Sequence, residues 1–135
     1  MTVKEYLGQA YRIDQRINSK LDQVLSLRTL ATKATSTLCH DKVKSSARSM
    51  EDTIAKIIDL EAEINRDIDQ LVDTKREIVS VIRLIQNPEY QTLLELRYLC
   101  FKTWEQIAVD LGYCMDAVFK MHRRALIVVS PLITV

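Results

Sequence analysis

Hydrophobic residues recur in alternating steps of three and four along the first two-thirds of the chain, and this spacing predicts two long helices. We expect the first helix to begin with a capping box from Thr2 to Glu5, and the second to begin after Ser49 as its N-cap. With their polar interruptions, the two stripes are Val3, Tyr6, Ala10, Ile13, Ile17, Lys20, Val24, Leu27 and Ala31, then Met50, Ile54, Ile57, Glu61, Ile64, Ile68, Leu71, Lys75, Ile78, Ile82 and Ile85. Each stripe needs a hydrophobic partner, so the pattern predicts a long antiparallel, coiled-coil-like helical hairpin.

The segment between the two helices, residues 29–48, is rich in Ser and Thr and has no clear period, which predicts a connection that is partly loop. One alignment of the stripes pairs Ile13 with Ile68, Ile17 with Ile64, Val24 with Ile57 and Leu27 with Ile54. In this register Lys20 lies opposite Glu61, which gives a lysine inside the seam its counter-ion. Lys75 would lie along the ring of Tyr6, with its ammonium in water.

Further apolar residues lie beside the stripes, and a two-helix hairpin cannot bury them. They are Leu7, Leu21, Leu25, Ile58, Leu60, Val72, Val79 and Val81. A second copy of the chain would cover them in a four-helix bundle, so we expect a homodimer. Docking of the C-terminal helices onto the hairpin is the alternative cover for part of this surface.

The stretch 87–126 predicts three shorter helices with clear beginnings and ends. Asn87 is an N-cap followed by Pro88 at the first helical position, and this helix should bury Leu93, Leu94 and Leu96. Thr103 and Gln106 form a second capping-box pattern. The inner face of that second helix is expected to be Trp104, Ile107, Ala108 and Leu111, and Gly112 ends the helix.

The third helix should start near Cys114 or Met115, keep Val118, Met121 and Leu126 for the core, and carry basic residues outside. Two helices joined by a glycine turn, with basic residues on the second, are typical of a helix-turn-helix, whose recognition helix lies in the major groove. The candidate DNA-binding residues are Lys102, Thr103, Met115, Asp116, Phe119, Lys120, His122, Arg123 and Arg124. Asp116 could instead stabilise the helix dipole, Arg123 and Arg124 suit phosphate better than bases, and His122 could be packed.

The run LELRYLCFKTWEQIAVDLGYCMDAVFKMHRRAL resembles region 4 of the sigma-70 family, which has an "LRY" helix, a "(S/T)(W/Y)xxIA" helix, "LG", and a recognition helix ending "HRRAL". The whole chain, beginning MTVKEYLGQAYRIDQRINSKL, is similar to small phage and prophage proteins of Gram-positive bacteria described as sigma-70 region 4-like or as regulators of phage late-gene transcription. The resemblance implies DNA binding, and it allows contact with RNA polymerase through the first of the three helices. Two positions depart from the sigma pattern: Cys114 replaces a capping serine, and Phe119 replaces a polar residue that faces DNA.

Composition narrows the function classes. The 135 residues are 47% hydrophobic and carry a formal net charge of +1, and the segment from residue 86 onward has as many acids as bases. One C-terminal unit therefore binds DNA weakly by itself, and useful affinity needs a dimer, the basic connection or RNA polymerase. The three cysteines have no CxxC spacing, so neither a disulfide framework nor a zinc site is expected.

Glycine-rich phosphate loops and nucleophile elbows are absent from the sequence, so we expect no enzyme, no catalytic residues, no cofactor and no small-molecule substrate. With no apolar signal segment or membrane-length run, we expect a cytoplasmic protein without a membrane partner.

The sequence thus predicts an all-α protein with a helical hairpin for oligomerisation in residues 1–85 and a sigma region 4-like helix-turn-helix in residues 86–130. The expected function is sequence-specific binding of double-stranded DNA by a phage or prophage transcriptional regulator, with activation as the expected output. Two alternatives stay open. One is a DNA-packaging protein of the small terminase type, and the other is an adaptor that grips RNA polymerase or a sigma factor without binding DNA.

Overall fold

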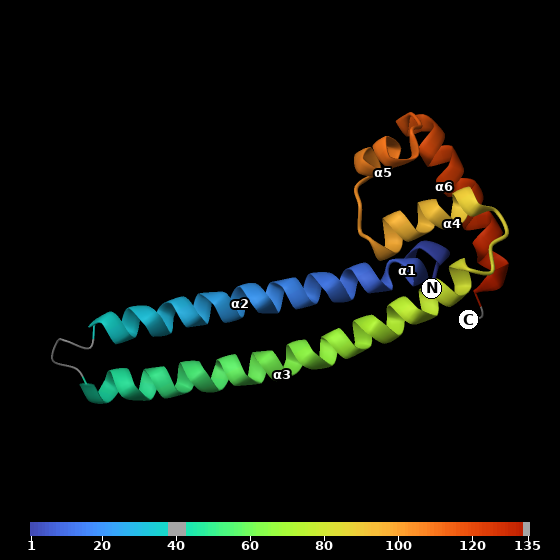
Figure 1. The fold of residues 1–135 in the computed structure, drawn as a ribbon. Coiled ribbons are helices and arrows are strands. Elements are labelled where there is room, and N and C mark those ends of the chain that lie inside the picture. The colour runs from blue at the N-terminus through green and yellow to red at the C-terminus, as the bar shows by residue number, and fades with distance from the viewer. Residues whose placement is uncertain (38–42, 134–135) are drawn as a thin grey trace. The chain divides into compact units, whose positions relative to one another are not determined.

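The computed structural model describes residues 1–37 and 43–133, and it describes side chains for residues 1–33 and 50–133. The elements are α1 (Val3–Leu7), α2 (Gln9–Thr37), α3 (Val43–Ile82), α4 (Pro88–Leu94), the π-helical turn η1 (Glu95–Leu99), α5 (Trp104–Leu111), α6 (Met115–Val129) and the 3-10 turn η2 (Ser130–Leu132) (Figure 1). The described residues contain no strand, so the predicted all-α class is confirmed.

The chain forms two compact units, which we describe separately. One unit comprises residues 13–70, and the other comprises residues 1–12 together with residues 71–135. The predicted division near residue 86 separates the segments by expected function, and it stays a prediction.

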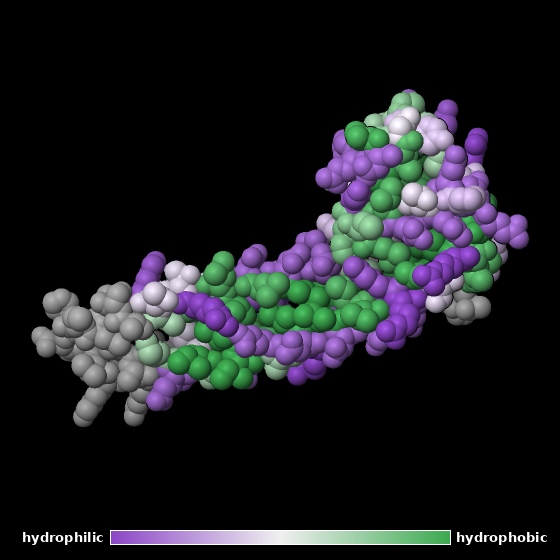
Figure 2. Space-filling model, in the orientation of Figure 1, coloured by the Kyte–Doolittle hydropathy of each residue, from purple (hydrophilic) through white to green (hydrophobic). Residues whose placement is uncertain are grey.

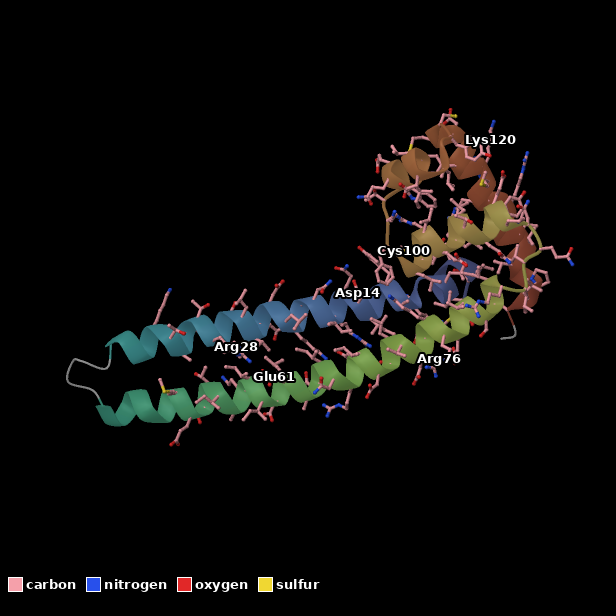
Figure 3. The ribbon with its side chains drawn as sticks, viewed as in Figure 1. Asp14, Arg28, Glu61, Arg76, Cys100 and Lys120 are labelled. Atoms are coloured by element: carbon pink, nitrogen blue, oxygen red, sulfur yellow. The ribbon has the colours of Figure 1, made fainter. Side chains whose placement is uncertain are left out.

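In the unit of residues 13–70, α2 and α3 run antiparallel to each other (Figure 1). Ile13, Ile17, Val24 and Ile64 are buried along this pair, as the heptad pattern predicts. Ion pairs also link the two helices, and Figure 3 shows the side chains of Arg28 and Glu61 pointing toward each other, with 2.6 Å between their charged groups.

The predicted register of this pair is wrong by about one helical turn. Lys20 does not meet Glu61: its Nζ lies 2.7 Å from Asp67 and 3.5 Å from Glu63, and Glu61 pairs with Arg28 instead. The shift moves two residues of the predicted stripe outward, since Ile54 is 47% exposed and Ile68 is 41% exposed. The hydrophobic pattern allowed more than one alignment of the two helices, because residues one turn apart on a helix share a face. The observed ion pairs form in the alignment that is shifted by one turn from the predicted one.

Reversing the charge of Lys20 tests the observed register. The hydrogen bond to Asp67 raises the pKa of Lys20, which shows that its charged form is favoured here. Lys20→Glu places three carboxylates together, so we expect the melting temperature to fall by about 2–5 °C. Adding Asp67→Lys should recover most of this loss.

The matched control adds Glu61→Lys to Lys20→Glu. Glu61 pairs with Arg28, so this change should lower the melting temperature further. The melting temperature is measured by circular dichroism. If Glu61→Lys restored it, the result would support the register predicted from sequence and contradict the observed one.

Three predicted helix limits are corrected. The first stripe is divided between α1 and α2 at Gly8, although the Thr2–Glu5 capping box is present as predicted. The predicted connection 29–48 is largely helical, because α2 continues to Thr37 and α3 already begins at Val43; residues 38–42 lie outside the described residues. Ser49 therefore lies within α3 and is not its N-cap.

The second unit has a core where α1, the end of α3, α4 and α6 meet. Its fully enclosed side chains include Leu7, Ile82, Leu94 and Val129. A second cluster, formed by Leu93, Ile107, Ala108 and Val118, packs α4, α5 and α6 together. The apolar faces predicted for α4 and α5 are thus confirmed. On α6, Val118 is buried as predicted, Met121 and Leu126 are partly buried, and the buried side also includes His122, Ala125 and Val129.

Phe101 turns the chain between η1 and α5. Its backbone is left-handed, with φ of 59°, which costs a residue with a side chain about 1–2 kcal/mol. The ring packs edge-on against Tyr11 with 5.6 Å between centroids, and the ammonium of Lys75 lies 4.8 Å from the Phe101 centroid. The predicted contact of Lys75 with Tyr6 is therefore corrected to Phe101.

Across the described ranges, each helix is too short or too polar to cross a membrane.

Candidate nucleic-acid interface

The start of α5 is set by its own side chains. The Thr103 hydroxyl accepts a hydrogen bond from the backbone N of Gln106 at 3.3 Å, and the Gln106 side chain accepts one from the backbone N of Thr103 at 3.0 Å. This is the predicted capping box. Ile107 and Ala108 then face the core, while Val109 is 81% exposed.

The turn between α5 and α6 depends on Gly112. Its φ of 73° is left-handed, and its backbone N donates to the carbonyl of Ala108 at 2.9 Å, which closes α5. The backbone N of Tyr113 donates to the same carbonyl at 3.1 Å. Cys114 is the N-cap of α6 and makes no side-chain capping bond. The chain therefore passes from α5 to α6 in three residues.

Substituting Gly112 tests this turn. A Cβ added there meets no atom within 4 Å, so the cost of Gly112→Ala is conformational, and we expect a loss of about 1 kcal/mol in unfolding free energy. Gly112→Asn should lose less, because asparagine tolerates the left-handed region better. Urea unfolding measures both, and equal stability of the alanine variant and the parent would contradict the assignment.

The buried side of α6 consists of Val118, His122, Ala125 and Val129. The opposite side exposes Asp116, Lys120, Arg123 and Arg124, and Lys120 is labelled on the outer side of the helix in Figure 3. In the described residues no carboxylate lies within salt-bridge distance of Lys120, Arg123 or Arg124. These three cations are thus free to meet an external anion.

His122 is a correction to the candidate DNA-binding set, because only 6% of the residue is exposed. The ring Nε2 lies 2.7 Å from the Tyr98 hydroxyl, and the ring packs edge-on against Trp104 at 4.6 Å between centroids. Burial, followed by the charges of Lys4 and Arg97, lowers the pKa of His122 to about 4. The imidazole is therefore neutral at pH 7 and belongs to the interior.

Three further candidate DNA-binding residues, Lys102, Thr103 and Met115, already make contacts within the protein. Lys102 is paired with Asp110 at 2.6 Å, and this hydrogen bond raises the pKa of Lys102. Thr103 is exposed, but its hydroxyl is engaged in the capping box. Met115 packs against the cluster around Ile107. The side chains of Lys102, Thr103 and Met115 are therefore engaged in contacts within the protein.

Phe119 lies between the core and the exposed face of α6. Its ring packs edge-on against Trp104 with 5.4 Å between centroids, yet 37% of the residue remains exposed. The contact with Trp104 orients the ring, and the exposed part is available to a thymine methyl group or an apolar protein surface.

Sequence reasoning missed the contacts of Arg97. Its guanidinium lies 4.4 Å from the centroid of the Trp104 ring and donates to the carbonyl of Lys102 at 3.0 Å, so it fixes the segment that leads into α5. Arg97 and Tyr98 lie within the "LRY" run of the sequence, which gives no sign of which residues they contact. Their partners are Trp104 for Arg97 and His122 for Tyr98, and the fold is what brings each pair together.

Among the described residues, no three His, Cys, Asp or Glu side chains are placed to hold a metal ion. The free cations on α6 and the exposed edge of Phe119 are accordingly the features of this unit that suit recognition of a macromolecule.

A family model described as "Protein of unknown function (DUF1492)" matches residues 31–129, a span that includes α5, the turn and α6. No curated protein and no solved structure matches the chain. Because the family model covers well over half of the sequence, this chain belongs to the DUF1492 family.

Proposed function

We propose that this protein is a sequence-specific DNA-binding regulator of phage or prophage transcription, and that α6 is its recognition helix. The observation that carries the proposal is the exposed side of α6, where Lys120, Arg123 and Arg124 have no counter-ion among the side chains that the structure describes. The three-residue turn after α5 and the resemblance to sigma-70 region 4 support a helix-turn-helix reading of this unit.

In this proposal the residues divide into two roles. Lys120, Arg123 and Arg124 contact phosphates on either side of the groove, while Asp116 and Phe119 lie nearer the bases at the start of α6. Asp116 can accept from a cytosine amino group, and Phe119 can touch a thymine methyl. Few phosphate contacts per chain make the affinity modest, so RNA polymerase or a second copy would contribute at the promoter.

The proposal is tested with purified protein and DNA fragments from the genomic region that encodes it. A gel shift at about 50 and 200 mM salt with competitor DNA separates specific from non-specific binding. A discrete band that resists competitor would support the regulator. Salt-labile smearing or no band would contradict it, and a complex containing a ring of many chains would favour a packaging protein of the small terminase type.

A second candidate is a protein adaptor that binds RNA polymerase or a sigma factor. The exposure of Val109, at 81%, and of Phe119, at 37%, favours it, because both lie on the helices of the candidate interface. Phe119→Ala separates the two functions. Loss of polymerase binding in a pull-down, with DNA affinity unchanged, would favour the adaptor.

A further inference from the structure

The unit of residues 13–70 exposes one continuous apolar face that its own core does not need. Its members are Leu21 (48% exposed) and Leu25 (64%) on α2, and Ile54 (47%), Ile58 (59%) and Ile68 (41%) on α3. Leu21 and Leu25 border a groove of about 420 Å³ between the two helices, together with Arg28, Glu61 and Asn65. Figure 2 shows hydrophobic side chains gathered along α2 and α3 between hydrophilic borders.

We propose that this apolar face binds a second copy of the chain in antiparallel orientation, about a two-fold axis that passes level with residues 23 and 63. The proposal concerns the hairpin alone and does not depend on DNA binding. We call this surface the hairpin face.

The first argument is that the face is self-complementary. Ile58 and Ile68 lie five positions before and after residue 63, and Glu61 and Asn65 lie two positions before and after it. Such symmetry is what an isologous interface requires, because each residue must meet its counterpart on the second copy.

The second argument is that α2 has the same symmetry at the same level. Leu21 and Leu25 lie two positions before and after residue 23. The hydrogen bond of 3.0 Å between Arg16 and Gln70 joins residues seven positions before 23 and seven after 63, so these two levels coincide. One axis therefore serves both helices.

The third argument is charge. Arg28 and Glu61 lie 2.6 Å apart and neutralise each other, so the middle of the face carries no net charge. About the proposed axis, Glu61 lies opposite Asn65 of the second copy, whose amide can donate to the carboxylate. Two copies thus meet without like-charge repulsion, with a polar centre that selects the register.

The fourth argument is area. The five half-exposed large side chains of the face correspond to roughly 500 Å² of apolar surface, which is the size that marks an interaction site and most of the ~800 Å² that each partner of a stable dimer buries. The opposite side of the hairpin is lined mainly by polar residues such as Gln15, Ser19, Asp22 and Gln23, and its leucines, Leu27 and Leu60, are less exposed than those of the hairpin face.

Sedimentation velocity of the full chain at about 1–100 µM tests the interface. We expect a dimer for the parent, and at least a tenfold weaker dimer for Ile58→Asp combined with Ile68→Asp. Leu30→Asp is the matched control, because Leu30 is also about half exposed (56%) but lies nine residues from Leu21, on the opposite side of α2. A monomeric parent, or equal weakening by the control, would overturn the proposal.

Cross-linking tests the orientation without relying on destabilised variants. In a background with Cys39, Cys100 and Cys114 replaced by serine, Ile58→Cys and Ile68→Cys are made separately and then mixed with a short bismaleimide. The antiparallel axis predicts linked chains in the mixture and few with either variant alone. Efficient linking of Ile58→Cys to itself would indicate a parallel dimer and overturn the proposal.

Discussion

Replacing Lys120, Arg123 and Arg124 together by alanine is expected to weaken DNA binding by about 10²–10³-fold at ~0.1 M salt, because each neutralised phosphate contributes through counterion release. The three side chains have no intramolecular counter-ion in the described residues, so their removal should cost the fold little. Fluorescence anisotropy at several salt concentrations measures the loss. The slope of log K against log salt should become shallower by about three if all three contact phosphate.

The matched control removes three cations away from α6 instead: Arg66→Ala and Arg76→Ala on α3, and Arg83→Ala directly after it. Both triple variants lose the same net charge, and the control residues also lack salt-bridge partners within the described ranges. Binding that falls equally in both variants would mean that general charge, rather than α6, attracts DNA. Circular dichroism should report the same helix content in both.

Acidification is expected to lower the free energy of unfolding, because His122 is held neutral in the folded protein. The pKa of His122 is lowered from its ordinary value of 6.5 to about 4, mainly by burial. Between these values the unfolded chain binds a proton that the folded chain does not, so stability present above about pH 6.5 is lost as the pH falls toward 4. A shift of this size corresponds to about 3 kcal/mol.

Urea unfolding of the parent and of His122→Gln, from pH 7 to pH 4, isolates this contribution. Glutamine can retain a hydrogen bond with Tyr98 but does not titrate, whereas the carboxylates titrate in both proteins. The parent should therefore lose about 3 kcal/mol more than the variant over this interval. Parallel curves would show that His122 is not held neutral by the fold.

The contacts that keep His122 neutral also hold α6 against η1 and α5. Tyr98 comes from η1 and Trp104 from the start of α5, and both contact the His122 ring. A charged imidazole at this point would disturb the packing beneath the exposed cations of α6. We therefore expect DNA affinity, if α6 carries it, to fall below about pH 5 together with stability.

The sequence by itself determined where several helices of this protein begin or end. Asn87, Thr103 and Gly112 set helix ends through hydrogen bonds and backbone preferences that involve only neighbouring residues, so their roles were predictable. The all-α class and the inner faces of α4 and α5 followed from hydrophobic periodicity for the same reason.

Only the tertiary structure decided which residues meet across helices. A heptad stripe repeats every turn, so several registers satisfy it, and the partner of Lys20 became clear only from the position of Asp67. The sequence left His122 open between DNA contact and packing, and its burial depends on Tyr98 and Trp104, which come from other elements. Periodicity assigns a residue to a face of its own helix, whereas its partner and its protonation depend on what packs against that face.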